Sequence, residues 1–213
     1  MPEHQSIRDT LRQYYARTAR ERDSRSMQDW KRAERDNFLA LLRQHGKTSL
    51  LEVGAGPGRD AKFFQDHGIQ TVCVDLSPEM VALCKEKGLD AHVMDMADLS
   101  FPGRAFDAVY AMNSLLHIPK AEFQTVLQRI DALLKPDGLF FLGLYGGVEQ
   151  EGVWENDTHL PKRFFSFYTD ADMQTAVRQV FDLLSFKTVA EVPDDPVHFQ
   201  SMVLRKRLLE KSL

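Results

Sequence analysis

The sequence predicts an α/β protein with a doubly wound, mainly parallel sheet. From Ser49 onward, short apolar runs alternate with amphipathic segments, which is typical of buried parallel strands connected by helices. The first apolar run leads directly into a glycine-rich turn that is followed by a helical segment. The chain has 213 residues, of which 43% are hydrophobic, so we expect one domain with one core.

Residues 6–45, ahead of the first strand, are predicted to be helical, with a break around residues 23–27. Apolar side chains recur at helical spacing on both sides of this break. The first helix is rich in arginine, but acidic residues lie between the arginines. We interpret this mixture as a solvated helix face, and a site for a polyanion is the alternative.

The parallel strands are predicted from five apolar runs: residues 50–53, 70–74, 91–94, 105–111 and 139–145. The segments between the runs carry helix signals. Ser77 and Pro78 are suited to the N-cap and first position of a helix, and Gly68 and Gly88 are suited to helix C-termini. An apolar stripe over residues 123–134 predicts a further helix, which ends at a Lys-Pro-Asp-Gly turn.

The end of the chain departs from this alternation. Residues 146–168 form a long polar stretch with isolated aromatic residues, and loops of this length in compact domains are usually functional. A helix is predicted from Thr169 to Val180. Two β-like segments follow, at residues 182–192 and 197–204, and their short connection predicts an antiparallel pair at one end of the sheet.

The glycine-rich turn is the most informative part of the sequence. Gly54, Gly56 and Gly58 directly follow the strand at residues 50–53, and they let the backbone turn sharply and approach a ligand closely. The free N–H groups of the following helix favour a negative group. Asp75 lies 75 − 54 = 21 positions past the first glycine, where a carboxylate can accept hydrogen bonds from ribose hydroxyls. We therefore expect a nucleotide-like cofactor here.

The spacing of the glycines separates two cofactor families. A dinucleotide-binding turn would need glycine at position 59, where this chain has Arg59. The pattern is instead G-x-G-x-G, two residues after Glu52, and here the sequence resembles the class I S-adenosylmethionine-dependent methyltransferases. Further stretches are similar to later motifs of that family, and the resemblance covers roughly residues 48–145; the stretches are residues 72–80, 95–102, 106–111, 115–119 and 134–140.

The resemblance implies a Rossmann-like sheet of seven strands, mostly parallel with one antiparallel strand at the end, and S-adenosyl-L-methionine as the cofactor, which leaves as S-adenosyl-L-homocysteine. Glu52 and the glycine turn would hold the methionine end, Asp75 the ribose, and Asp95 the adenine edge. As alternatives, Glu52 caps a turn and Asp95 is a plain loop carboxylate. The implied cofactor-binding residues are Tyr14, Tyr15, Glu52, Gly54, Ala55, Gly56, Gly58, Asp75, Leu76, Asp95, Met96, Ala111 and Asn113.

Tyr14 and Tyr15 belong to a stretch similar to the N-terminal helix that folds over the cofactor in many of these enzymes. One of their hydroxyl groups, or a nearby arginine, would reach the cofactor's carboxylate. Packing of both rings against the sheet is the alternative. No metal is expected.

Methyl transfer from a sulfonium needs an aligned nucleophile and, for a phenol, alcohol or ammonium, a base. His117 is the candidate base, because it lies just past the fourth strand, where ligands of open α/β sheets bind. Capping of the next helix, or a hydrogen bond to a backbone carbonyl, is its alternative role. Tyr145 is the second catalytic candidate.

The stretch after the fifth strand supplies the candidate acceptor-binding residues. Arg163 is suited to binding a carboxylate through two hydrogen bonds, and aromatic residues with a few polar groups are typical of a small-molecule pocket. Anchoring of the stretch in the core is the alternative for the aromatic residues. The candidates are Trp154, His159, Arg163 and Phe164.

The sequence also predicts partners and organisation. The net charge of −4 and the absence of an apolar segment of about 20 residues argue against nucleic acid and membrane partners, so we expect a small-molecule acceptor. We also expect a cytoplasmic protein with two reduced cysteines, as a monomer or homodimer. The expected parts of the single domain are a helical lid at 1–45, a cofactor-binding half at 46–145, an acceptor-side loop at 146–168, and a final helix and strand pair at 169–213.

Other functions remain open from the sequence alone. Within the same class, an RNA or protein methyltransferase would be favoured by a basic face formed by the N-terminal arginines. A protein that binds S-adenosylmethionine without transferring the methyl group is a different class. A nicotinamide-dependent oxidoreductase is the third, although Arg59 replaces the glycine that its turn would need.

Overall fold

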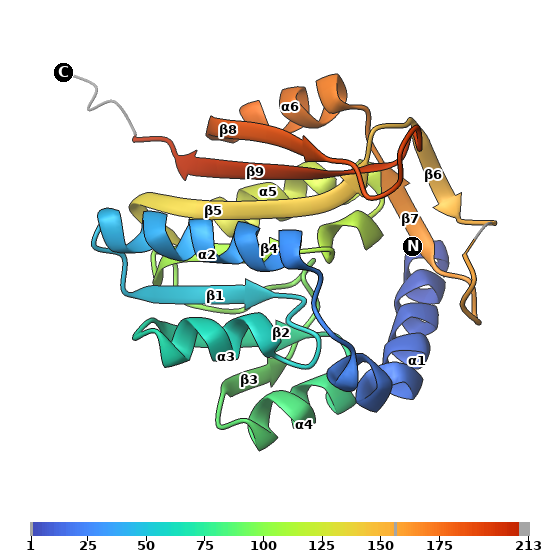
Figure 1. Cartoon of the computed structure of the whole chain (residues 1–213), viewed down its shortest axis with the longest axis horizontal. Coiled ribbons are helices and arrows are strands. Elements are labelled where there is room, and N and C mark those ends of the chain that lie inside the picture. The colour runs from blue at the N-terminus through green and yellow to red at the C-terminus, as the bar shows by residue number, and fades with distance from the viewer. Residues whose placement is uncertain (1, 156, 209–213) are drawn as a thin grey trace.

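A twisted sheet of seven strands forms the centre of the molecule, in the order β3-β2-β1-β4-β5-β9-β8 (Figure 1). The structure is a computed structural model and describes residues 2–155 and 157–208, with side chains from Ser6 onward. The strands are β1 (Ser49–Val53), β2 (Gln70–Asp75), β3 (Asp90–Val93), β4 (Phe106–Met112), β5 (Leu134–Gly146), β8 (Phe181–Val189) and β9 (His198–Lys206).

Strands β1 to β5 are mutually parallel, and β9 is antiparallel to both of its neighbours, β5 and β8. The predicted doubly wound, mostly parallel sheet is therefore confirmed. The predicted pairing of the last two strands is confirmed as well. The single antiparallel strand is β9, and it lies one place in from the edge of the sheet, because the β8–β9 hairpin joins β5 through its second strand.

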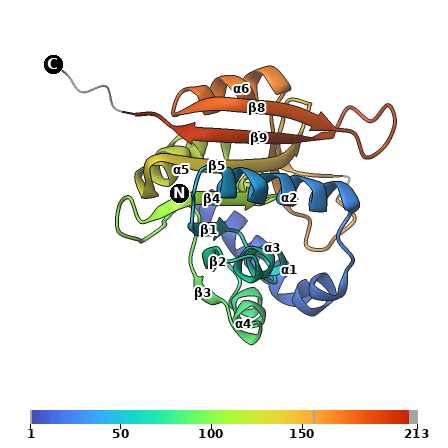
Figure 2. The same cartoon turned by 60° about the vertical axis from the view of Figure 1, so that its left-hand side comes forward.

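Helices cover both faces of the sheet (Figures 1 and 2). On one face Phe38, Phe64, Tyr110 and Phe141 form an apolar cluster, in which the Tyr110 and Phe141 rings stack with centroids 4.7 Å apart. The other face is covered by α5 and α6. The helices are α1 (Pro2–Ser24), α2 (Asp29–Gln44), α3 (Arg59–Asp66), α4 (Pro78–Glu86), α5 (Lys120–Leu133) and α6 (Asp170–Arg178), with a 3-10 turn η1 (Leu115–His117).

The helix boundaries follow local chemistry. The Ser77 hydroxyl caps α4 by accepting a hydrogen bond from the Met80 N–H at 3.3 Å, and Pro78 is the first helical residue, as predicted. Gly68 and Gly88, which follow α3 and α4, have positive φ values of 86° and 75°. The predicted break between the N-terminal helices lies between Ser24 and Asp29.

The stretch at residues 146–168 is more regular than the sequence predicts. It contains a two-stranded antiparallel sheet of β6 (Gln150–Val153) and β7 (Phe164–Phe167), where the sequence pattern predicted only loop. Phe165 and Phe167 are buried in the main core, and Trp154 packs edge-on against both rings. This aromatic anchor packs β7 against the main core and places it beside η1.

Helix α1 lies at the end of the sheet toward which β1 points, and it packs against α4 (Figure 1). Ala19 of α1 is buried against Met80 and Leu83 of α4. Two ion pairs border this contact: Arg20 with Glu86 at 2.9 Å and Asp23 with Lys87 at 2.8 Å. Within residues 2–155 and 157–208, no helix is both long and apolar enough to span a membrane.

Candidate active site

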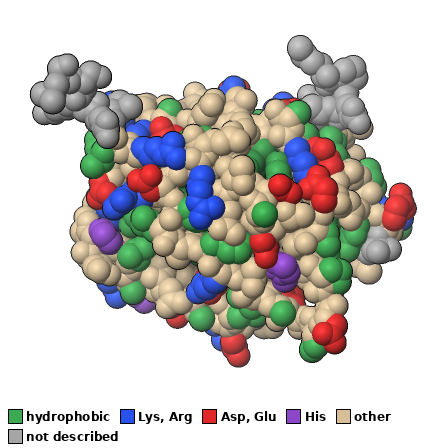
Figure 3. Space-filling view, turned by 90° about the horizontal axis from the view of Figure 1, so that it is seen from above, with side chains coloured by type: hydrophobic (Ala, Val, Ile, Leu, Met, Phe, Trp, Pro, Cys, Tyr) green, Lys and Arg blue, Asp and Glu red, His purple; other side chains and the backbone are tan. Residues whose placement is uncertain are grey.

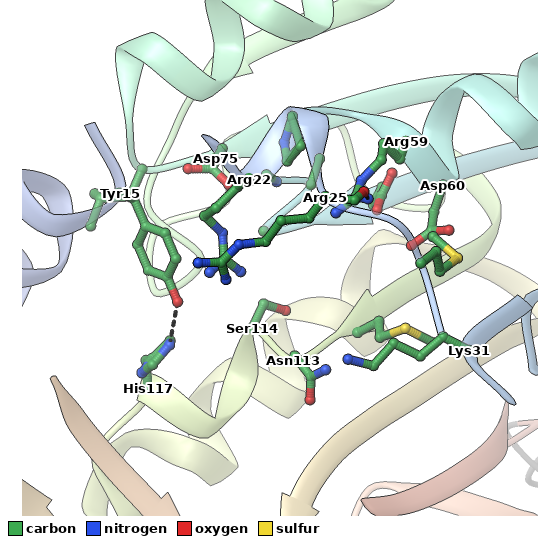
Figure 4. Close-up of a pocket in the computed structure, with 18 of the residues that line it drawn as sticks. Tyr15, Arg22, Arg25, Lys31, Arg59, Asp60, Asp75, Asn113, Ser114 and His117 are labelled. Carbon is green, nitrogen blue, oxygen red and sulfur yellow. Dashed lines mark hydrogen bonds between the residues drawn. The ribbon is translucent and has the colours of Figure 1, made fainter. Parts of the chain in front are cut away.

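A cavity of about 760 Å³ lies at the carboxyl ends of β1, β2 and β4, between the sheet and the N-terminal segment (Figure 4). Parallel α/β sheets bind their ligands at this edge. Many of the residues predicted from the sequence line it: Tyr15, Glu52, Gly54, Ala55, Gly56, Asp75, Leu76, Met96, Asn113 and His117.

The three glycines of the turn after β1 are required for different reasons, although all three have positive φ. A Cβ atom on Gly54 would lie 2.3 Å from the Cβ of Ser114, so this position needs close approach to the β4 exit loop. A Cβ atom on Gly58 would lie 2.7 Å from the Cys84 Sγ, so Gly58 serves packing and does not line the cavity. Gly56 faces open space, because a Cβ atom there would have no neighbour within 4 Å, and it leaves room for a ligand.

Asp75 joins the end of β2 to the glycine turn. Its Oδ2 accepts a hydrogen bond from the Gly56 N–H at 2.8 Å, and its Oδ1 accepts one from the Ser77 N–H at 2.9 Å. Burial raises the pKa of Asp75, and the two backbone hydrogen bonds oppose this change by stabilising the carboxylate. The carboxylate is therefore held in place on the cavity wall.

Glu52 is a buried carboxyl group on the cavity wall, with only 4% of its surface exposed. Among the described residues, its Oε2 atom has no hydrogen-bond partner. Burial, followed by the nearby carboxylate of Asp60, raises the pKa of Glu52 well above its usual range. A cationic ligand group that donates to the unpaired Oε2 would favour the ionised form of Glu52 and lower its pKa.

Tyr15 and His117 meet across the cavity, from α1 and η1 respectively (Figure 4). His117 Nδ1 lies 2.8 Å from the carbonyl oxygen of Phe164, which can only accept, so Nδ1 carries the proton. His117 Nε2 then accepts a hydrogen bond from the Tyr15 hydroxyl at 2.7 Å. Burial lowers the pKa of His117 to about 4, so the imidazole is neutral at pH 7. The predicted base is thus present as its neutral form.

Asn113 follows β4 on the opposite side of the cavity from Asp75. It has a positive φ of 55°, which is stabilised by a 2.7 Å hydrogen bond from its N–H to the Gly143 carbonyl. Its side-chain Oδ1 is buried and has no partner among the described residues. The Lys31 side chain points toward Asn113 (Figure 4).

The remaining predicted cofactor residues lie off the cavity wall. Tyr14 is buried with 1% exposure, beneath the Arg163 guanidinium, because neighbouring positions on a helix face different directions. Ala111 is fully buried in β4. Asp95 forms an ion pair with Arg8 of α1 and accepts a hydrogen bond from the Ala97 N–H at 2.7 Å.

Arg163 is the predicted acceptor clamp, but the structure places its donors elsewhere. Its Nε and Nη2 bind the two oxygens of the buried Asp157 at 2.8 and 3.0 Å, and its guanidinium stacks on Tyr14 and Phe165. His159 also binds Asp157, at 2.9 Å. The hydrogen bonds from Arg163 and His159 hold the pKa of Asp157 well below its usual range, although burial acts in the opposite direction. Arg163 and His159 therefore stabilise the β6–β7 segment and do not line the cavity.

The other acceptor-side candidates also lie away from the cavity wall. The Tyr145 hydroxyl donates a hydrogen bond to Glu191 at 2.6 Å, and burial raises the pKa of Tyr145. Trp154 packs on the core, and Phe164 contributes its backbone carbonyl to His117. The core-anchoring alternative describes Phe165 and Phe167, which are buried in the main core.

The cavity also contains residues that the sequence motifs did not mark as site residues. Most come from the N-terminal segment, where the break between α1 and α2 directs side chains inward. The arginine-rich composition and the helix break were the sequence features that could have marked these residues. The direction of their side chains, however, depends on how α1 docks. The added residues are Leu11, Arg22, Arg25, Ser26, Met27, Gln28, Lys31, Pro57, Arg59, Asp60, Met112 and Ser114.

Comparisons with known proteins agree with this geometry. A family model described as "Methyltransferase domain" matches residues 50–138. The chain is 32% identical to a glycine N-methyltransferase of Rattus norvegicus over 125 residues, and 35% identical to a dTDP-3-amino-3,6-dideoxy-alpha-D-glucopyranose N,N-dimethyltransferase of Streptomyces fradiae over 112 residues. The matches cover 49% and 50% of this chain but only 43% and 44% of the relatives, so the chain matches less than half of their length.

The fold as a whole is similar to that of a solved structure from Burkholderia thailandensis, 1,6-didemethyltoxoflavin-N1-methyltransferase with bound 1,6-didemethyltoxoflavin and S-adenosylhomocysteine. The TM-score is 0.73 at 24% identity, and the match covers 97% of this chain and 90% of that chain. Residues 50–138 therefore match the methyltransferase domain family, in agreement with the class I S-adenosylmethionine-dependent methyltransferase motifs that the sequence predicted there.

The walls of the cavity fit the cofactor of this class. Gly56 leaves open space beside the turn, the Asp75 carboxylate is fixed at the end of β2, and the unpaired Oε2 of Glu52 suits an ammonium group. Among residues 2–155 and 157–208, no group of three or more His, Cys, Asp and Glu side chains is placed to hold a metal ion.

Proposed function

We propose that this protein transfers the methyl group of S-adenosylmethionine to a small-molecule acceptor by in-line displacement. The observation that carries the proposal is the shared cavity: the glycine turn, Glu52, Asp75 and the Tyr15–His117 pair all line it. Its volume of about 760 Å³ lies within the range typical of small-molecule sites.

The comparisons support a small acceptor. The two curated relatives are named as N-methyltransferases of glycine and of a nucleotide-linked amino sugar, and the solved structure holds a small molecule beside S-adenosylhomocysteine. The positions of Arg22 and Arg25 also argue for this proposal over the RNA alternative, because both side chains line the cavity. On the face shown in Figure 3, basic and acidic side chains are interspersed.

When bound, the cofactor supplies a methyl group already activated by a sulfonium, so catalysis depends mainly on alignment and exclusion of water. We assign binding of the ribose to Asp75 and of the ammonium group to Glu52. The lid residues between Tyr15 and Lys31 close the cavity on the side opposite the sheet. In this arrangement the N-terminal segment keeps water from the reacting atoms.

We assign proton removal to His117. Its Nε2 lone pair is available to an acceptor once the Tyr15 hydroxyl rotates away, and its Nδ1 stays fixed by the Phe164 carbonyl. A weak base is sufficient where the acceptor's own proton becomes acidic as its atom bonds to the methyl group. We do not extend this role to Tyr145, whose hydroxyl is bound to Glu191.

The first test is calorimetric titration with S-adenosylhomocysteine, with NADH in parallel. We expect micromolar binding of S-adenosylhomocysteine, about −8 kcal/mol, and none of NADH. A preference for NADH, or no binding, contradicts the cofactor assignment. Transfer of a labelled methyl group to members of a small-molecule panel then separates an enzyme from a protein that only binds the cofactor.

We propose that residues 1–45 act as the lid, residues 46–145 bind the cofactor, and residues 146–168 support His117 through the Phe164 carbonyl. A cytoplasmic location, the monomeric or homodimeric state, and the lack of nucleic acid and membrane partners rest on the sequence alone.

A further inference from the structure

The two walls of the cavity differ in the ionisable side chains that line them. The sheet-side wall holds the acids Glu52, Asp60 and Asp75, together with Arg59. The lid side, formed by lining residues from the N-terminal segment up to Lys31, contributes cations and no acidic residue: Arg22, Arg25 and Lys31. The acidic side chains are therefore separated from the lid cations across the space in which an acceptor would lie.

Two of the lid cations have no acidic partner. No carboxylate of the described residues lies within 4.0 Å of the Arg22 guanidinium or the Lys31 ammonium, whereas Arg25 pairs with Glu21. The Arg22 Cζ lies 5.1 Å from the Tyr15 ring centroid, and the Lys31 Nζ lies 5.0 Å from that of Trp30. Burial lowers the pKa of Lys31, and the carboxylates of Glu191 and Asp60, which lie beyond ion-pair distance, only partly oppose this change.

The cofactor cannot neutralise both cations. S-adenosylmethionine carries one carboxylate, but its ammonium and sulfonium groups give it a net charge of +1. Its binding therefore adds positive charge to a cavity whose lid wall is already cationic. One carboxylate can satisfy Arg22 or Lys31, and the other cation still lacks a partner.

From this arrangement, we propose that the acceptor carries an anionic group, a carboxylate or a phosphate, and that this group binds beside the cofactor to whichever of the lid cations Arg22 and Lys31 the cofactor's carboxylate leaves free. The inference rests on the proposed function and specifies its substrate class. Arg22 lies near the Tyr15–His117 pair and Lys31 lies near Asn113 (Figure 4), so both cations border the space beside the cofactor in which an acceptor would lie. Arginine and lysine both form charge-assisted hydrogen bonds to such groups.

The test uses inorganic phosphate and acetate as probes of the protein saturated with S-adenosylhomocysteine. Each anion is titrated calorimetrically at constant ionic strength into the wild type, Arg22→Gln, Lys31→Gln and a control, Arg17→Gln. Arg17 lies on the same helix as Arg22, is exposed, and does not line the cavity. The affinity of each variant for S-adenosylhomocysteine alone is measured first, and thermal melting checks that each variant is folded.

We expect at least one of the two anions to bind the wild type, and to bind the Arg17→Gln protein with the same affinity. We expect Arg22→Gln or Lys31→Gln to weaken the binding of that anion about 10-fold or more. Which probe binds better distinguishes a phosphate from a carboxylate acceptor. If one variant loses S-adenosylhomocysteine affinity, that side chain holds the cofactor's carboxylate, and the other variant must then lose the anion.

Two results would overturn the inference: no binding of either anion to the wild-type complex, or equal anion affinity in all four proteins. Failure of the proposed function has a separate readout, because it appears as absence of S-adenosylhomocysteine binding to the wild type before any anion is added.

Discussion

At the scale of single residues, the site depends on buried polar groups whose partners are specified by geometry. His117 is the clearest case, because the carbonyl of Phe164 fixes which ring nitrogen carries the proton and so leaves the other as an acceptor. Asp75 is similar, since two backbone N–H groups fix its carboxylate. Both residues were predicted from the sequence, and a backbone carbonyl was expected as a possible partner of His117, but neither Phe164 nor the two partners of Asp75 were identified.

Replacing Asp75 tests the proposed ribose contact. Asp75→Ala removes the carboxylate, so we expect S-adenosylhomocysteine to bind more weakly by about 1–3 kcal/mol, the scale of a hydrogen bond to a charged group. Calorimetry measures the change. Asp98→Ala is the matched control, because Asp98 is exposed and lies outside the cavity. Unchanged affinity in Asp75→Ala means that the cofactor does not bind over this turn.

The buried neutral form of His117 predicts a pH dependence of stability. Its folded pKa of about 4 lies below the unfolded value of about 6.5, so the unfolded state binds more protons between these values. The contribution of His117 to the free energy of unfolding is therefore fully present above pH 6.5 and is lost as the pH falls to about 4. The loss is about 3 kcal/mol at most.

Urea unfolding of the wild type and His117→Asn at pH 7 and pH 5 measures this contribution. We expect the wild type to lose more stability than the variant over this interval, while the exposed-site control His45→Asn follows the wild type. Equal losses in the wild type and His117→Asn mean that His117 protonates as readily in the folded state as in the unfolded one.

At the scale of elements, α1 is the part of the molecule that completes the cavity, and its contact with α4 is small. Ala19 packs against Met80 and Leu83, and the flanking ion pairs are partly or well exposed. Exposed ion pairs contribute little to stability. The apolar contact of Ala19 therefore stabilises the docking of α1 on α4, while Tyr14 beneath Arg163 and Tyr15 against His117 hold the same helix at the other side of the cavity.

The substitution Ala19→Asp should release α1, since it places an unpaired carboxylate against Met80 and Leu83. We expect about 10-fold weaker S-adenosylhomocysteine binding, and faster hydrogen exchange in α1 than in β1 and β4. Arg17→Asp, at an exposed position of the same helix, should keep wild-type affinity. Slow exchange in α1 together with lost affinity would point to a cause other than lid opening.

At the scale of the whole molecule, the sequence predicts the parts of the fold that local patterns encode. The glycine turn, the Ser77–Pro78 cap and the alternating strands need only their neighbours in the chain. The position of β9 between β5 and β8 requires long-range pairing, and no local pattern specifies it. The same distinction applies to the site. Glu52 and Asp75 follow from motifs, whereas the inward direction of Arg22 depends on the docking of α1.

The place of β9 in the sheet has a consequence for the nascent chain. β8 pairs with β9 alone, so the edge of β5 stays open from the time residue 146 leaves the ribosome until residue 206 follows. At about 5–20 residues per second, these 206 − 146 = 60 residues take roughly 3–12 s to synthesise. During that interval the apolar edge of β5 can pair with strands of other chains. Biosynthesis therefore passes through an aggregation-prone state that chaperones would have to protect, although the finished sheet covers this edge.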